Sequence, residues 1–370
     1  MFTDARTETL AFEPPAGRWQ EAAAARALPL DPARLRAAKR GCVTRCVDLA
    51  QIARIITGGR PRAGDLLLAR VLEIGHHRRI ELPSGRKAQL FEGDELLLAY
   101  GARYASDQFA AVVPEDLAPC DLVAAGGLAG RCTSRHERTR RPTRIAPVGL
   151  LADARGRVLA LRDFAPLGRQ GEGRGEATPP FTLAVVGTAM NAGKTTTAAA
   201  LVRGYRRLGR RVAALKATGT GSGGDRFALL DAGAAPVFDF TDLGFASTCR
   251  LPGAELEAIF TRLLAAAAAA GAEVAVVEIA DGLLFEDTAR LVGSAAFRRR
   301  VDALVLAAAD ALGAAGSVHW LRDHGLAPAL VSGALTASPL AVREAEGALA
   351  LPVVPPAVLA AGLQLPSCGR

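Results

Sequence analysis

One short stretch restricts the fold of this chain more than any other, because it joins a strand pattern, a small-residue loop and a helix pattern. Residues 183–196 read Leu-Ala-Val-Val-Gly-Thr-Ala-Met-Asn-Ala-Gly-Lys-Thr-Thr, and an alanine-rich run follows. The apolar β-branched run predicts a buried strand, and the alanine-rich run predicts a helix. The backbone N–H groups of such a loop and the positive end of the helix dipole together bind a phosphate group. The stretch therefore predicts a phosphate-binding loop.

The spacing of this loop assigns roles to its residues. It departs by one position from G-x-x-x-x-G-K-[ST], because Gly187 stands six residues before Gly193 instead of five. Lys194 is expected to reach the β- and γ-phosphates, and the Thr195 hydroxyl is expected to hold Mg²⁺. The residues predicted to bind the nucleotide are Gly187, Thr188, Ala189, Met190, Asn191, Ala192, Gly193, Lys194, Thr195 and Thr196.

The 370-residue chain is long enough for two domains, and its composition changes along its length. Residues 1–45 are rich in Pro, Arg and Ala and are predicted to be partly disordered, with short helices at most. A helix is expected at 47–58. Short strands between Gly-Asp and Ser-Gly turns predict a β-rich, barrel-like domain over residues 46–165. The Gly- and Pro-rich residues 166–180 predict a linker. The strands of the β-rich domain are expected at 65–74, 79–82, 87–91, 95–100, 121–125, 144–151 and 157–161.

Residues 181–370 alternate between strand and helix patterns. Strands are expected at 182–187, 211–216, 236–240, 273–279, 302–308 and 328–333. Helices are expected at 193–209, 224–233, 253–270, 287–299, 313–324 and 338–348. Apolar strands that alternate with helices predict a parallel sheet covered by helices on both faces. The fold class predicted for the chain is thus α/β, with an additional β-rich N-terminal domain.

The composition argues against several classes of protein. No apolar run is long enough to span a membrane, and the first residues lack the order of a signal peptide. Six cysteines in a chain of this length do not form a disulfide framework, so a reducing cytoplasmic location is expected. Neither Cys42-x-x-x-Cys46 nor Cys132 with His136 has the spacing and number of ligands of a metal site. His76 and His77 are interpreted as exposed residues of a turn.

The net charge of +8 is concentrated in the first half of the chain. Residues 1–180 hold 28 basic and 21 acidic residues, whereas residues 181–370 hold 17 and 16. The densest basic segment runs from Arg131 to Arg144 and contains no Phe, Tyr or Trp on which bases could stack. A solvated loop is therefore preferred to an anion or nucleic-acid patch, and nucleic acid is not expected as a partner.

Charged residues lie where the predicted strands of the α/β domain end. Lys216 ends the second strand, Glu278 ends the fourth, and Asp310 follows the fifth. Asp225 follows a Gly-rich segment suited to a loop over phosphates. Ligand groups of open α/β sheets gather at these carboxyl ends, so Glu278 is a candidate for Mg²⁺. The structural alternatives are a cap for Glu278, a helix N-cap for Asp225 and a turn for Asp310; Asp239 and Asp242 are interpreted as loop residues.

With these residues in view, the sequence resembles dethiobiotin synthetase. The loop from Gly187 to Thr195 has that family's offset glycine, Lys216 resembles its Lys-Pro-Val segment, and Val277–Leu284 resembles its Val-Glu-Gly-Ala-Gly-Gly-Leu segment. The superfamily also contains nickel-insertion GTPases and molybdopterin-guanine-dinucleotide accessory proteins. The resemblance implies that Thr195, Glu278 and Asp225 bind Mg²⁺. It also implies that Lys194 and Lys216 stabilise charge on the transferring phosphoryl group.

The sequence favours an ATP- and Mg²⁺-dependent enzyme that activates a small, unidentified substrate by phosphoryl transfer, a ligase or synthetase in preference to a kinase. Ala217 and Ile279 stand where dethiobiotin synthetase has proline and glycine, so a different substrate is expected. ATP is favoured over GTP, because no Asn-Lys-x-Asp element is present. Two alternatives stay open: a nucleotide-switch accessory protein for cofactor or metal delivery, and a nucleic-acid 5′-kinase. A homodimer is also left open.

Overall fold

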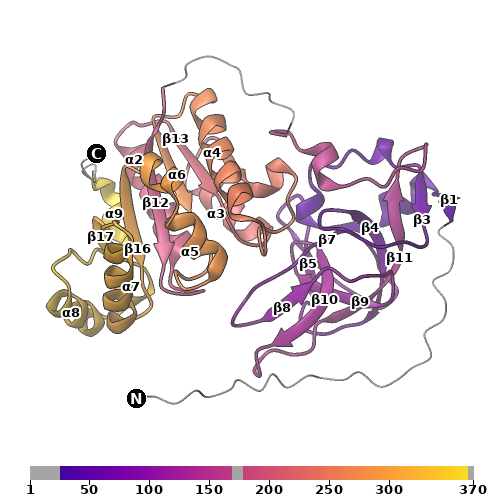
Figure 1. The fold of residues 1–370 in the computed structure, drawn as a ribbon, viewed down its shortest axis with the longest axis horizontal. Helices are drawn as coiled ribbons and strands as arrows, with labels where there is room; N and C mark the ends of the chain where they lie inside the picture. The colour runs from indigo at the N-terminus through magenta and orange to yellow at the C-terminus, as the bar shows by residue number, and fades with distance from the viewer. Residues whose placement is uncertain (1–25, 169–177, 366–370) are drawn as a thin grey trace.

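The computed structural model describes residues 26–168 and 178–365, which form two domains lying side by side (Figure 1). Residues 1–25 and 169–177, which hold most of the predicted disordered segment and most of the predicted linker, lie outside the described residues. No helix within the described ranges is long and apolar enough to cross a membrane.

The N-terminal domain is built around a closed ring of five strands. Strand β4 pairs with β7 and β11, strand β10 pairs with β7 and β9, and β9 also pairs with β11. All of these pairs are antiparallel except β7 with β10. The predicted barrel-like domain is therefore present. Its elements are β1 (Ala27–Pro29), α1 (Pro32–Ala37), β2 (Lys39–Arg40), η1 (Cys42–Thr44), η2 (Leu49–Gln51), β3 (Arg54–Ile56), β4 (Leu66–Glu73), β5 (Arg79–Glu81), β6 (Lys87–Gln89), β7 (Glu95–Tyr100), β8 (Phe109–Val112), β9 (Cys120–Ala124), β10 (Leu128–Arg135), β11 (Thr143–Ala152) and η3 (Leu161–Phe164).

Both faces of the ring are buried, which explains the continuous apolar runs of its strands. In β4, Leu66 and Leu68 pack in one cluster with Ile55 of the preceding segment. Leu67 packs in a second cluster with Ile80 of β5. Successive side chains of a strand point to opposite faces, so an unbroken apolar run requires cover on both.

Three predictions for this domain are wrong. Residues 26–45 contain two strands where short helices at most were expected, because β1 pairs with β3 and β2 pairs with β7; the short helix α1 agrees with that prediction. A 3-10 turn and strand β3 replace the helix predicted at 47–58. The strand predicted at 157–161 forms only isolated bridges before η3. Strands β1, β2 and β3 pair with strands distant in the sequence, so a local pattern could not reveal them. Residues 157–161 do meet the nearby Ala152, but single bridges do not form a continuous ladder.

The C-terminal domain contains a six-stranded parallel sheet in the order β14-β13-β15-β12-β16-β17. All six strands were predicted, and each observed strand lies within its predicted range or within one residue of it. The elements are β12 (Phe181–Gly187), α2 (Lys194–Arg207), β13 (Val212–Lys216), α3 (Gly223–Asp231), β14 (Val237–Asp239), η4 (Phe240–Leu243), α4 (Gly253–Ala269), β15 (Val274–Glu278), α5 (Glu286–Val292), α6 (Ala295–Arg300), β16 (Ala303–Ala307), α7 (Ala311–Asp323), β17 (Leu330–Ser332), η5 (Ala334–Ala337), α8 (Pro339–Ala348) and α9 (Pro356–Gly362).

Helices cover both faces of this sheet, as predicted (Figure 1). Ala184 and Val186 of β12 pack with the helices α4 to α7 on one face. Leu183 and Val185 pack with α2, α3 and α9 on the other. This double cover is the reason that the strands read as continuous apolar runs.

The helices differ from the prediction at two places. The helix predicted at 287–299 is divided into α5 and α6, because the hydroxyl of Ser294 caps the second by accepting a hydrogen bond from the backbone N–H of Phe297. Helix α9 was not predicted. It packs closely on α2, where a Cβ at Gly204 would lie 2.1 Å from the carbonyl oxygen of Leu359.

Candidate functional site

The predicted phosphate-binding loop connects β12 to α2, and glycine is required at both of its ends. Gly193 has a φ of 91°, and a Cβ there would lie 2.8 Å from the backbone nitrogen of Ala334. A Cβ at Gly187 would lie 2.7 Å from Cδ of Lys194. The offset glycine therefore makes room for the lysine side chain, which folds back over the end of the strand.

Lys194 is a buried cation whose hydrogen-bond acceptor is uncharged. Its side chain lies at the start of α2, the residue is 7% exposed, and Nζ donates to the carbonyl oxygen of Ala189 at 2.7 Å. Burial lowers the pKa of Lys194, and the neighbouring acids Glu278 and Asp281 oppose this change. No carboxylate of the described residues forms an ion pair with it. A buried ammonium group whose acceptor is a neutral carbonyl lacks a counter-charge, so it is suited to bind an anion.

Two adjacent strands bring the predicted lysine and glutamate together. Lys216 of β13 and Glu278 of β15 are partners in the parallel register. Thr195 Oγ1 lies 3.0 Å from Glu278 Oε1 and 3.3 Å from Asp225 Oδ1. Lys216 forms an ion pair with Asp225, and its Nζ lies 3.7 Å from Glu278 Oε1. The structure therefore brings together Lys194, Thr195, Lys216, Asp225 and Glu278.

The charges of this cluster depend on one another. Burial raises the pKa of Glu278, which is 2% exposed, although Lys216 favours its charged form. Burial also opposes ionisation of Asp225, but Lys216 outweighs it and holds the pKa of that carboxyl below its usual value. Burial works against the charge of Lys216, yet Glu278 and Asp225 raise its pKa. In this cluster, the carboxylates of Asp225 and Glu278 thus stabilise the charge of the Lys216 ammonium.

The oxygen atoms of the cluster suit Mg²⁺. Glu278 Oε2 is buried and has no hydrogen-bond partner in the described structure, so a polar group is left to be satisfied. Thr195 and Asp225 supply further oxygens beside it. Within the described ranges, no group of three or more His, Cys, Asp or Glu residues could hold a metal by itself. One or two carboxylates that share the ion with phosphates is the arrangement that Mg²⁺ prefers.

The cluster opens into a cavity of about 520 Å³ that both domains line. Lys194, Glu278 and Asp281 lie on the α/β side. His77, Glu81, Arg103 and Gln108 lie on the side of the N-terminal domain. The candidate site is therefore formed by the two domains together. A sequence pattern within one domain could not have predicted this arrangement.

Loops of the N-terminal domain contact the phosphate-binding loop and its surroundings directly. The side chain of Asn191 donates to Asp107 at 2.6 Å. Glu81 of β5 accepts from the backbone of Gly223 at 2.9 Å, at the start of α3. The rings of Tyr104 and Phe285 stack with centroids 4.0 Å apart. These contacts hold the domains together around the cavity.

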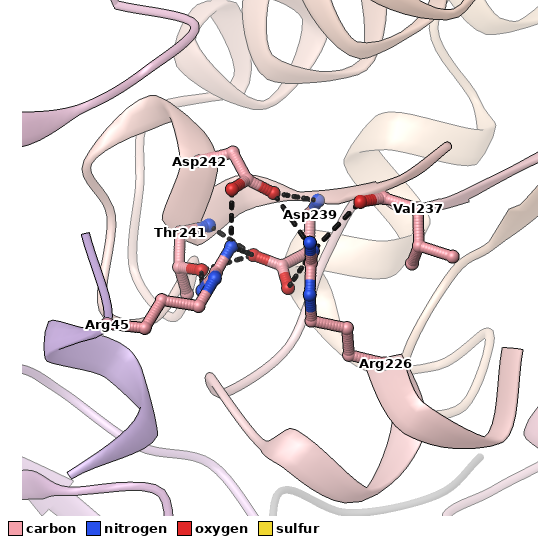
Figure 2. A network of polar contacts seen from close by, with 6 residues as sticks. All are labelled: Arg45, Arg226, Val237, Asp239, Thr241 and Asp242. Atoms are coloured by element: carbon pink, nitrogen blue, oxygen red, sulfur yellow. Dashed lines mark hydrogen bonds and ion pairs between the residues drawn. The ribbon is translucent and has the colours of Figure 1, made fainter. Parts of the chain in front are cut away.

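A buried network of ion pairs forms a further part of the interface (Figure 2). Arg45, which follows η1, forms ion pairs with Asp242 and Asp239. Arg226 of α3 contacts the same two carboxylates and donates to the carbonyl of Val237 at 2.8 Å. The interpretation of Asp239 and Asp242 as simple loop residues is wrong, because their buried carboxylates join the two domains.

The remaining predicted residues take other places. Asp225 is not the N-cap of α3, because Ser222 occupies that position. Asp310 has a structural role, but as the N-cap of α7 and not as the turn that was the alternative: it accepts from the backbone of Gly313 at 2.6 Å. His77 is buried instead of exposed, and its Nε2 lies 3.1 Å from the carbonyl oxygen of Val123. The basic residues of the segment from Arg131 to Arg144 are exposed, as expected, but the segment is not one loop, because Arg131 and Arg135 lie in β10 and Arg144 lies in β11.

Sequence reasoning did not single out two residues of the cavity, Arg103 and Glu81. A third residue of the cavity, Asp281, lies in the segment from Val277 to Leu284 that carries the resemblance. Asp281 has a φ of 63°, a conformation that is strained for most side chains but tolerated by Asp and Asn. The signal that could have revealed it is the Asp-Gly pair three residues beyond Glu278. For Arg103 no local signal exists, since its importance depends on the contact between domains.

With a phosphate-binding loop, a parallel sheet and helices on both faces, the fold of the C-terminal domain is established. It is the P-loop NTPase fold. No family model matches the sequence, and no curated protein is detectably similar to it.

Several solved structures show a remote likeness. The signal recognition particle receptor FtsY of Elizabethkingia anophelis, solved with GDP, is 15% identical with a TM-score of 0.29, and the match covers 46% of this chain and 54% of that chain. The 54 kDa signal recognition particle protein of Aeropyrum pernix, also with GDP, is 17% identical with a TM-score of 0.28 over 54% and 42%. FtsY of Thermotoga maritima is 20% identical with a TM-score of 0.31 over 47% and 60%. Matches this weak say nothing about the reaction of this chain.

Proposed function

We propose that this protein is an ATP- and Mg²⁺-dependent enzyme that activates a small substrate by phosphoryl transfer. The observation that carries the proposal is the convergence of Lys194, Thr195, Lys216, Asp225 and Glu278 on one cavity between two domains. A cavity closed by a second domain gives room for an acceptor beside the nucleotide and limits the access of water.

The proposed roles follow from charge and position. Lys194 and Lys216 donate to the phosphate oxygens and stabilise the charge that develops on the transferring group. Thr195 and Glu278, with Asp225 as a third ligand, hold Mg²⁺, which neutralises phosphate charge when it is bound. The backbone from Gly187 to Thr196 encloses the phosphates.

The reaction proposed is of the ligase or synthetase type, by resemblance to dethiobiotin synthetase. Ala217 and Ile279 depart from that family, and the N-terminal domain has no counterpart in it, so we propose a substrate other than a biotin precursor. The absence of an Asn-Lys-x-Asp element from the sequence supports ATP over GTP.

A nucleotide switch is the second candidate. The hydrogen bond between Asn191 of the phosphate-binding loop and Asp107 of the N-terminal domain favours it, because a nucleotide could change the domain contact there. A switch hydrolyses slowly and binds a protein partner, whereas an enzyme gives a burst of ATP turnover that depends on a small substrate. Measuring ATP hydrolysis with fractionated small metabolites separates the two.

The test of nucleotide binding is a thermal-shift measurement with Mg·ATP and Mg·GTP. A ligand at 100 times its Kd stabilises the folded state by about 2.7 kcal/mol, so Tm should rise with Mg·ATP and rise less with Mg·GTP. Lys194→Ala should abolish the shift. Arg203→Ala, at an exposed position on the same helix, should retain it. An equal shift in Lys194→Ala would show that the phosphate site lies elsewhere.

A further inference from the structure

The cavity contains a second buried cation that resembles Lys194 in its surroundings. Arg103 follows β7, is 8% exposed, and forms no ion pair with the carboxylates that the structure describes. Lys216, by contrast, is paired with Asp225 in the same cavity. A buried charge without an opposite charge is costly, so its retention requires a reason.

The groups that hold Arg103 are all neutral. One guanidinium nitrogen donates to the carbonyl oxygen of Val123 and lies 3.3 Å from His77 Nε2. The other donates to the Gln108 amide oxygen at 2.9 Å, and Nε has no hydrogen-bond partner among residues 26–168 and 178–365. Burial lowers the pKa of Arg103 to about 10 and that of His77 to about 3, so at neutral pH the arginine is charged and the histidine is not.

The loop that carries Arg103 lies against the phosphate-binding loop. Asp107, four residues further on, accepts from Asn191, and Tyr104 stacks on Phe285. The carboxyl of Asp281 experiences the charges of Lys194, Lys216 and Arg103 together. Arg103 therefore approaches the cavity from the N-terminal domain, while Lys194 approaches it from the other.

A comparison with Arg45 shows that a structural arginine looks different here. Arg45 also lies at the domain interface, with 12% of its side chain exposed, but two carboxylates, those of Asp239 and Asp242, neutralise it (Figure 2). Arg103 has the same need for a counter-charge, but Asp107 and Asp281 act on it without forming an ion pair, and no carboxylate of the described residues contacts it. The guanidinium fork is suited to an oxyanion with two oxygens, such as a phosphate or a carboxylate.

We propose that Arg103 is an anion-binding residue of the site, which binds an oxyanion brought into the cavity opposite Lys194. The oxyanion is the terminal phosphate of the nucleotide or an acidic group of the second substrate. This inference rests on the proposed function and adds to it. The N-terminal domain lines the cavity and also contributes a charged residue that binds an anion there.

The experiment uses the full-length chain and three variants, Arg103→Gln, Arg103→Lys and, as a control, Arg131→Gln at an exposed position of β10. Calorimetry measures Kd for Mg·ADP, for Mg·ATPγS, and for malonate added to protein saturated with Mg·ADP. A charge-assisted hydrogen-bond pair is worth about tenfold or more in affinity. If the anion is the terminal phosphate, Arg103→Gln should weaken ATPγS about tenfold and leave ADP within about twofold.

If the anion belongs to the second substrate, Arg103→Gln should instead weaken malonate about tenfold while both nucleotides bind as before. Arg103→Lys should fall between the wild type and Arg103→Gln, and it decides the question if Arg103→Gln does not fold. Arg131→Gln should match the wild type throughout. Unchanged affinities for ATPγS and malonate in the Arg103 variants would overturn this inference alone. A wild-type chain that binds neither nucleotide would overturn the proposed function with it.

Discussion

A single hydroxyl, that of Thr195, lies between two carboxylates at the centre of the candidate site. Of these carboxylates, that of Glu278 has the oxygen without a partner, so we expect it to matter most for Mg²⁺. Glu278→Gln should retain most nucleotide affinity but reduce turnover by about a hundredfold or more, because the metal stabilises charge chiefly in the transition state. Glu286→Gln, at an exposed position of α5, serves as the control for steady-state ATP turnover. Normal turnover in Glu278→Gln would move the metal role to Asp225 or Asp281.

A second prediction at the residue scale concerns Asp281 and the pH dependence of the free energy of unfolding of the nucleotide-free protein. Burial raises its pKa to about 6, above the value of about 3.9 for an unfolded chain. The folded state therefore binds more protons than the unfolded state between these values, and the free energy of unfolding should fall as pH rises from 4 to 6. Asn tolerates the same left-handed backbone, so Asp281→Asn should flatten this slope and stabilise the protein by about 1–2 kcal/mol at pH 7. Urea unfolding at pH 4, 5, 6 and 7 measures both slopes, and parallel slopes would refute the assignment.

At the scale of elements, the interface between η1 and η4 depends on buried charge. Arg45→Met removes one of two cations that neutralise Asp239 and Asp242, and the second, Arg226, stays. Burial and the neighbouring Asp239 already raise the pKa of Asp242, so the loss leaves surplus negative charge. Breaking a buried pair in this way costs about 3 kcal/mol, which urea unfolding at pH 7 would measure. Adding Asp242→Asn should recover part of this loss.

The control for Arg45→Met is Arg60→Met, because Arg60 pairs with Glu115 at the surface, where both side chains are exposed. Exposed pairs contribute little, so its effect should stay within about 0.5 kcal/mol. Equal losses in the two variants would mean that the network of Figure 2 does not hold the domains together.

At the scale of the whole molecule, we expect the α/β domain to bind the nucleotide and the N-terminal domain to contribute to substrate-stimulated hydrolysis. The hydrophobic clusters of the α/β domain lie within that domain, with Leu167 as an addition from the start of the predicted linker. A fragment of residues 166–370 should therefore fold and bind Mg·ATP, because every proposed phosphate and metal ligand lies in it. It should lose substrate-stimulated hydrolysis, since His77, Arg103 and Gln108 are removed from the cavity. Stimulated rates equal to those of the full chain would leave the N-terminal domain with a structural or partner-binding role.

Local sequence was sufficient for much of the C-terminal domain. Strands β12 to β17 and the loop from Gly187 to Thr195 follow from apolar periodicity, glycine and the helix start, which are properties of neighbouring residues. The proximity of Lys216 and Glu278 could also be predicted, because each residue stands at the carboxyl end of a strand in a parallel sheet. The N-terminal domain was predicted less well: β8 and β10 were missed, and β1 to β3 stand where disorder and a helix were expected.

Long-range packing was needed for the remainder, and the physical reason is the same in each case. Strands β1 and β2 are stabilised by hydrogen bonds to partners distant in the chain. The carboxylates that neutralise Arg45 belong to the other domain, and the cavity beside Arg103 is lined by both domains. A sequence pattern reflects interactions between residues that are close in the chain. Burial between domains depends instead on how two folded surfaces pack. The chemistry of the phosphate site could thus be predicted from local sequence, but the cavity in which we propose it acts could not.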